Sequence, residues 1–163
     1  MLLTMEARAL ASLGESSTCA AVLTKAEQAF ERRTPDGDPA WIGYFDHAEL
    51  AGEAAHCFRD LQQATETETF SALALDPVLT PPRTRALIDM VRARGALHAG
   101  NLDQALATAR AAIELSGSLR SRRWRSYVRE FLRAAADAHG KDARVVDLAS
   151  FVSERFKLAS KIS

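Results

Sequence analysis

The sequence predicts an all-helical protein in which about eight helices form antiparallel pairs. Three observations favour this fold class. Apolar residues recur at the spacing of helix faces along nearly the whole chain, and no stretch alternates persistently as a strand would. Alanine, the residue that most favours helix, occurs 31 times. The 8 glycines and 5 prolines lie mostly where one helical segment ends and the next begins.

Turn and capping signals place the individual helices. Gly14 ends the first helix, and Ser16 or Ser17 can cap the second. Residues 34–39, TPDGDP, form the clearest break. The expected helices cover residues 2–13, 16–32, 41–61, 64–75, 82–99, 103–116, 120–138 and 142–157, in the pairs 2–32, 41–75, 82–116 and 120–157. The expected left-handed helix ends are Gly100, Gly117 and Gly140.

An internal repeat appears when Gly14, Gln62 and Gly100 are aligned as the turn within a pair. Small residues then recur five and twelve positions later, where they allow close helix packing: Cys19, Thr67 and Ala105, then Ala26, Ala74 and Ala112. This pattern is typical of tetratricopeptide repeats, whose helix pairs stack into a right-handed solenoid. The consensus tryptophan, leucine and closing proline positions are not met. We therefore expect one tetratricopeptide-like domain over residues 1–163.

Charge is unevenly distributed along a chain whose formal net charge is zero. Residues 1–80 contain 13 acidic and 5 basic side chains, and residues 81–163 contain 8 acidic and 16 basic ones. The halves therefore carry −8 and +8, which would suit either head-to-tail association or two solvated faces. Charged residues interrupt every apolar segment, and the start does not resemble a signal peptide. A cytoplasmic protein without a membrane segment is expected.

The helix expected at residues 41–61 carries the most informative surface. Asp46, Glu49, Glu53, His56 and Asp60 share one face, at spacings of three and four. The first helix of a tetratricopeptide pair lines the concave groove, so this face is predicted to bind a protein or peptide. The predicted groove residues are Glu49, Glu53, His56, Arg59, Asp60, Arg94 and His98. Alternatively, the arginines at positions 8 and 94 pair with these glutamates between repeats.

A second candidate surface is an arginine stripe in the helix expected at residues 120–138. Its members are Arg122, Arg125, Arg129 and Arg133. Such a stripe could bind an acidic partner or phosphates. The alternative is the solvated or acid-paired side of an ordinary amphipathic helix, because Trp124 and Tyr127 lie on its apolar side. Direct nucleic-acid binding is not expected.

Neither catalysis nor a cofactor is expected. The chain contains no nucleophile elbow, nucleotide-binding glycine loop or His-Glu-x-x-His motif. Glu53-Ala-Ala-His56 has the spacing of di-iron ligands, but the second copy that such a site needs is missing, so no metal is expected. Cys19 and Cys57 lie in alanine-rich helices and are expected to pack there.

Three stretches resemble a known family: WIGYFDHAELAGEAAHCFRDL (residues 41–61), GNLDQAL (100–106) and SGSLRSRR (116–123). From Ala7 onwards the chain is similar to the C-terminal helical-repeat half of actinobacterial helix-turn-helix transcription regulators. A DNA-binding domain precedes the repeats in those regulators, whereas here a repeat helix is expected from residue 2. The resemblance therefore implies the sensing or oligomerising part of a regulatory system. The alternatives are a homodimerisation module and a helical bundle that binds a small ligand or metal.

Overall fold

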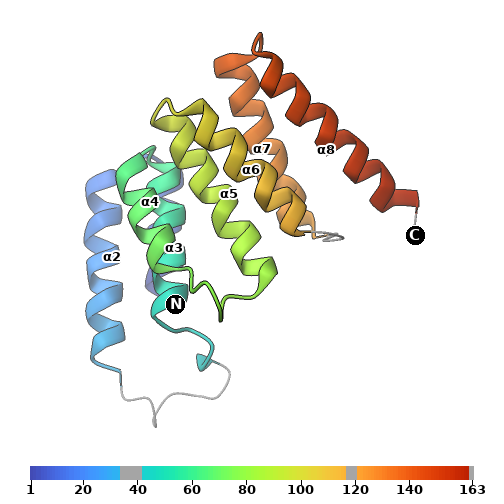
Figure 1. The fold of residues 1–163 in the computed structure, drawn as a ribbon. Helices are drawn as coiled ribbons and strands as arrows, with labels where there is room; N and C mark the ends of the chain where they lie inside the picture. Colours follow the sequence, from blue (N-terminus) through green and yellow to red (C-terminus); the bar gives the residue numbers. More distant parts are fainter. Residues whose placement is uncertain (34–41, 117–120, 162–163) are drawn as a thin grey trace. The chain divides into compact units, whose positions relative to one another are not determined.

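The computed structural model describes residues 1–33, 42–116 and 121–161. These residues form eight α-helices and no strand, which confirms the predicted fold class (Figure 1). Consecutive helices pack as antiparallel pairs: α1 with α2, α3 with α4, α5 with α6, and α7 with α8. The helices are α1 (Leu2–Ser12), α2 (Ser16–Glu31), α3 (His47–Asp60), α4 (Ala64–Leu73), α5 (Pro82–His98), α6 (Leu102–Ser116), α7 (Arg122–His139) and α8 (Ala143–Lys161).

The chain divides into two compact units. Unit 1, Met1–Val78, contains α1 to α4, and unit 2, Leu79–Ser163, contains α5 to α8. The boundary coincides with the change in charge along the sequence, so unit 1 carries −8 and unit 2 carries +8. The single solenoid domain and its right-handed twist remain predictions.

The turns within the first three pairs share one backbone geometry. Gly14, Gln62 and Gly100 all adopt left-handed conformations, with φ of 77°, 59° and 78°. At each turn the amide of the following residue donates to the carbonyl five residues before it, with N···O distances of 2.9 to 3.0 Å. This is the Schellman helix end, which satisfies carbonyls that the helix leaves without partners. The turn alignment predicted from the repeat is therefore confirmed, including its one non-glycine member.

Burial confirms the register of the repeat in unit 1 and unit 2. The small residues five and twelve positions after each turn are all buried: Cys19, Thr67, Ala105, Ala26, Ala74 and Ala112. A further regularity was missed in the sequence, because an alanine also lies seven positions before each turn. These alanines are Ala7, Ala55 and Ala93, and each is fully buried. The close approach of the helices therefore rests on small residues in both members of a pair.

The fourth pair departs from the expected turn. Gly140 has φ of −62° and is right-handed, so the predicted left-handed end is wrong there. Asp142 begins the next helix instead, because its carboxylate accepts from the amide of Arg144 at 2.9 Å and from its guanidinium at 2.6 Å. These bonds lower the pKa of Asp142 to about 2. The register nevertheless continues, since Val145 and Val152 are buried five and twelve positions after Gly140.

One helix cap and two helix boundaries differ from their predictions. Helix α2 begins at Ser16 as expected, but its N-cap is Glu15, the residue that directly follows the Schellman turn at Gly14, and not Ser16 or Ser17. Asp46 caps α3 by accepting from the amide of Glu49, so α3 begins about six residues later than predicted. The last helix continues to Lys161, past the expected end at residue 157. Gly117, Trp41 and Arg120 lie outside the described residues.

Each unit has its own apolar core. In unit 2, Trp124 and Phe131 of α7 are almost fully buried among side chains of the neighbouring helices. In unit 1, Cys57 of α3 packs onto the first pair beside Ala7 and Cys19. No helix among the described residues is long and apolar enough to cross a membrane.

Candidate functional site

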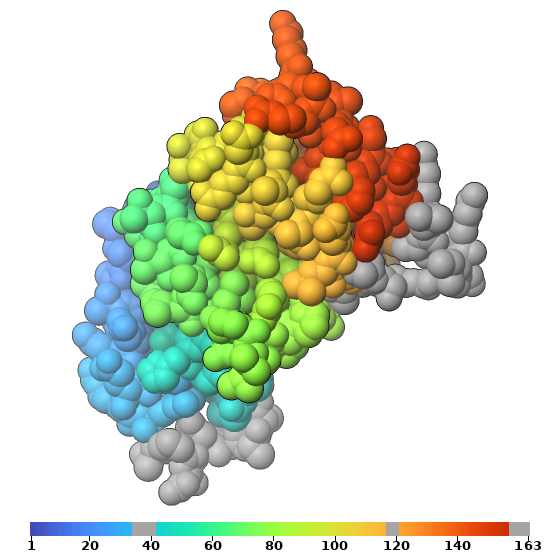
Figure 2. All heavy atoms as spheres, viewed as in Figure 1, coloured from blue at the N-terminus to red at the C-terminus, as the bar shows by residue number. Residues whose placement is uncertain are grey.

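An apolar cleft of about 330 Å³ lies in unit 1, between α2, α3 and α4. Figure 2 shows the surfaces of α2 and α4, in blue and green, side by side on one face of this unit. The cleft is mainly aliphatic and aromatic, with polar groups only from Thr24, Glu27 and His47. Its lining residues are Ala20, Leu23, Thr24, Glu27, His47, Leu50, Ala51, Ala54, Phe58, Phe70 and Leu73.

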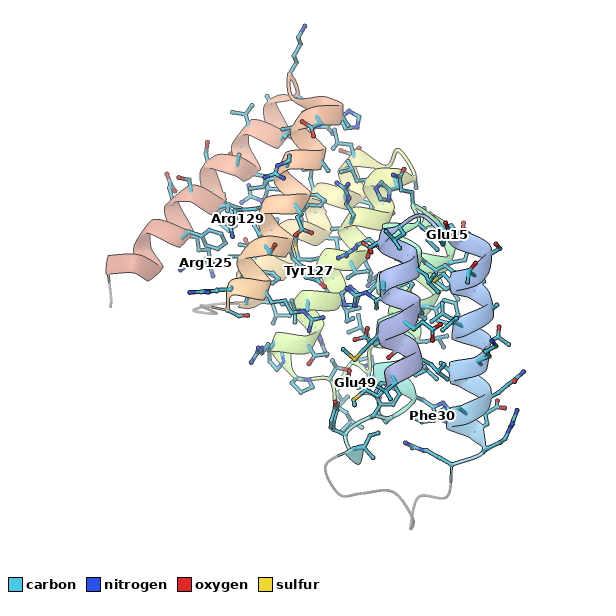
Figure 3. The ribbon with its side chains drawn as sticks, turned by 180° about the vertical axis from the view of Figure 1, so that it is seen from behind. Glu15, Phe30, Glu49, Arg125, Tyr127 and Arg129 are labelled. Atoms are coloured by element: carbon cyan, nitrogen blue, oxygen red, sulfur yellow. The ribbon has the colours of Figure 1, made fainter. Side chains whose placement is uncertain are left out.

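Aromatic contacts order the walls of this cleft. Phe58 of α3 stacks on Phe70 of α4, with ring centroids 5.1 Å apart. The ring of His47 packs edge-on against the ring of Phe30, with ring centroids 4.5 Å apart. Phe30, labelled in Figure 3, lies near the C-terminal end of α2. Leu73 is 64% exposed although it lines the cleft. Aromatic packing between the helices therefore fixes the walls of the cleft, while the large apolar side chain of Leu73 is exposed to solvent.

The cleft lies on a different side of α3 from the face that the sequence singled out. Leu50, Ala54 and Phe58 line it, at spacings of four. Because each helical residue turns the chain by about 100°, Glu49, Glu53 and His56 point about 100–160° away from the direction of Ala54, at the centre of that line. The acidic face and the cleft therefore belong to the same helix, and the more enclosed surface is the apolar one.

Several residues of the predicted groove are paired or buried within unit 1. Arg8 of α1 donates to Glu53 at 3.1 Å, and both side chains are about a quarter exposed. For Arg8, this pair corresponds to the alternative in which an arginine of one repeat pairs with a glutamate of the next. Arg59 donates to its neighbour Asp60 at 2.6 Å, and His56 is only 3% exposed.

The remaining groove residues are distributed between the units. Glu49 lies in the first turn of α3, where Figure 3 labels it, and its amide is held by Asp46. Arg94 and His98 belong to α5 in unit 2. A groove formed by all of these residues together remains a prediction.

The two cysteines pack inside unit 1, as predicted. Both are fully buried and free. The Cys19 thiol donates to the carbonyl of Ala7 at 3.4 Å, which joins α1 to α2. Burial raises the pKa of both thiols, most strongly that of Cys57, and thereby disfavours the reactive thiolate.

The arginine stripe of α7 lies in unit 2. Arg125 lies over the ring of Phe156 of α8 at 5.5 Å, and Arg129 donates to the carbonyl of Arg125 at 3.3 Å. Figure 3 shows both on the side of α7 towards α8, away from Tyr127. Arg122 and Arg133 are exposed. None of the four makes an ion pair with an acidic residue in the described part of the chain, so the acid-paired alternative finds no partner there.

A second open groove of about 530 Å³ lies between α7 and α8. Its lining residues are Leu132, Ala136, Gly140, Val145, Val146, Ala149, Ser150, Ser153 and Glu154. Val146 is largely exposed, and Leu132 and Ala136 continue the side of α7 that carries Arg125 and Arg129. The groove is thus mainly apolar, with Ser150, Ser153 and Glu154 as its polar lining, and Arg125 and Arg129 lie on the same side of α7 outside that lining.

Comparisons with known family models, curated proteins and solved structures found no match. Within residues 1–33, 42–116 and 121–161, no three His, Cys, Asp or Glu side chains are grouped so that they could hold a metal ion. The chain is therefore characterised by its architecture, as an all-helical protein of sequential antiparallel pairs. Membership of the transcription-regulator family that the sequence resembles remains a prediction.

Proposed function

We propose that this chain is a helical-repeat interaction module that binds an apolar peptide segment in the cleft between α2, α3 and α4. The observation that carries the proposal is the cleft itself, where apolar side chains from three helices surround about 330 Å³. Peptide grooves of helical proteins commonly take one or two apolar anchor side chains in this way.

The charge of unit 1 narrows the class of peptide. Glu27 lies at the cleft, and the unit as a whole carries −8. A basic residue next to the apolar anchors would therefore be attracted, whereas an acidic one would be repelled. The bound segment is accordingly apolar with lysine or arginine at its flanks.

The acidic face of α3 has a structural role in this proposal. Glu53 joins α3 to α1 through Arg8, so its carboxylate is already engaged within the unit. The role of the module in transcription regulation rests only on the family resemblance. The proposed binding activity does not depend on that role.

The test uses the whole chain as bait for random short peptides displayed on phage. Enriched peptides are expected to share apolar anchors flanked by lysine or arginine. Ala20 is an exposed residue of α2 that lines the cleft, so Ala20→Trp should fill the cleft without disturbing the core. It should weaken binding of an enriched peptide by about tenfold or more, as loss of an anchor pocket typically does.

Ala21→Trp provides the matched control, because Ala21 is also exposed on α2 but does not line the cleft. Peptide affinity should be unchanged in this variant. If both variants bind the peptide as the unmodified chain does, the cleft is not the binding site. If no peptide is enriched and a small apolar dye binds in a manner that Ala20→Trp abolishes, the small-ligand alternative replaces the proposal.

A further inference from the structure

Helix α3 packs onto the first pair, α1 and α2, through one of its faces. The residues of α1 at the same positions in the repeat are exposed. Four α3 residues, at spacings of three, four and four, meet the first pair. Leu50 lines the cleft shared with α2, and Glu53 pairs with Arg8. Cys57 and Leu61 pack on the core of the first pair. These residues lie twelve, nine, five and one positions before the turn residue Gln62.

The same four positions before Gly14 are Leu2, Met5, Ala9 and Leu13. All four are exposed, and the three large side chains are 78%, 63% and 76% accessible. Helix α1 therefore presents an apolar stripe in the register that the following repeat uses to pack onto its predecessor. We define Leu2, Met5, Ala9 and Leu13 as the α1 stripe.

The groove between α7 and α8 is equivalent, in the repeat register, to the α2 side of the unit 1 cleft. The α2 residues that line the unit 1 cleft lie six, nine, ten and thirteen positions after Gly14. The residues of α8 at the same distances from Gly140 are Val146, Ala149, Ser150 and Ser153, and all four line the second groove. The α7–α8 groove therefore exposes the α8 face that corresponds to the α2 face next to α3.

Charge favours contact between these two faces. Glu6 lies beside the α1 stripe in a unit of −8. Arg129 and Arg133 lie on α7 near the groove, in a unit of +8, and make no ion pair with the described acidic residues. The carboxylate of Glu6 beside the apolar α1 stripe thus complements the arginines beside a largely apolar groove, whose own lining includes one carboxylate, that of Glu154.

We propose that the α1 stripe of one chain docks into the α7–α8 groove of a second copy, in the manner in which α3 packs on the first pair. The contact is heterologous, since each copy contributes a different face. Such association leaves one free end of each kind and continues into longer assemblies unless a ring closes. It is distinct from the peptide cleft, which uses neither face.

Two charge substitutions block the two ends separately. Met5→Arg places a cation in the α1 stripe, opposite the arginines of α7, and Ala149→Glu places an anion in the groove, opposite Glu6. Both sites are exposed, so folding should be retained. Ala29→Arg and Ala138→Glu make the same charge changes at exposed alanines outside both faces and are the matched controls.

Sedimentation velocity on the full chain gives the readout. The unmodified chain and both controls should show a mass that increases continuously with concentration and falls on addition of salt. Met5→Arg and Ala149→Glu should each be monomeric alone. Their mixture should regain association, because the intact stripe of one variant can dock into the intact groove of the other. A chain that is monomeric at all concentrations overturns the proposal, and so does a mixture that fails to pair. Dimerisation that survives Ala149→Glu alone would indicate symmetric contact through α1 and would also overturn it.

Discussion

Replacing Gln62 with glycine should stabilise the protein, because Gln62 occupies a left-handed position that its two repeat equivalents fill with glycine. The left-handed conformation costs an L residue about 1–2 kcal/mol. The greater freedom of glycine in the unfolded chain offsets about 0.5–1 kcal/mol of that gain. The expected net effect of Gln62→Gly is therefore an increase of about 0.5–1 kcal/mol in the free energy of unfolding.

Urea denaturation followed by far-ultraviolet circular dichroism measures this change. Gly14→Ala is the reciprocal variant, and a methyl group there would meet no heavy atom within 4 Å, so it isolates the backbone effect. It should lower stability by about 1 kcal/mol. If Gln62→Gly is neutral or destabilising while Gly14→Ala behaves as expected, the Gln62 side chain contributes native contacts that outweigh its backbone strain, and the equivalence of the turns does not extend to their energetics.

Three further predictions concern unit 1 and the start of α8. Glu53→Gln should lower the free energy of unfolding by about 0.5–1 kcal/mol in low salt and by less in high salt, as measured by urea denaturation. The thiols of Cys19 and Cys57 should react with a thiol reagent at neutral pH only after denaturant is added, because burial shields them and raises their pKa. Asp142 has a pKa of about 2 when folded against an ordinary value of 3.8, so its contribution to stability is present above about pH 4 and is lost as the pH falls towards 2. Asp142→Asn should flatten that part of an acid denaturation profile; an unchanged profile would show that the ion pair does not contribute.

The fold class and the repeat register could be predicted because they depend on local and periodic features. Gly14 and Gly100 indicate turns directly, and small residues at fixed distances from a turn indicate close helix packing. The fourth pair was not aligned, because Gly140 adopts a right-handed conformation and valines replace the small residues at positions 145 and 152. The start of α3 at His47 could not be predicted either, because apolar residues continue at helical spacing before Asp46, whereas Asp46 caps the helix, which therefore begins directly after it.

The sequence shows less of the candidate site than of the fold, because ion pairing depends on tertiary contacts. A row of carboxylates on one helix predicts a binding face only if the fold leaves them without partners. The sequence cannot show that Arg8, 45 positions from Glu53, lies within 3.1 Å of its carboxylate. The cleft residues Leu23, Leu50 and Leu73 resemble ordinary core residues in the sequence. Their role emerges only when three helices are placed around them.

The most direct test of the central claim is a methyl NMR titration of the whole chain with a peptide enriched on it. Binding in the cleft predicts the largest shifts at the methyl groups of Leu23, Leu50 and Leu73, and the loss of those shifts in Ala20→Trp. Shifts confined to leucines outside the cleft, such as Leu3 and Leu10 beside the core of the first pair, would contradict the account.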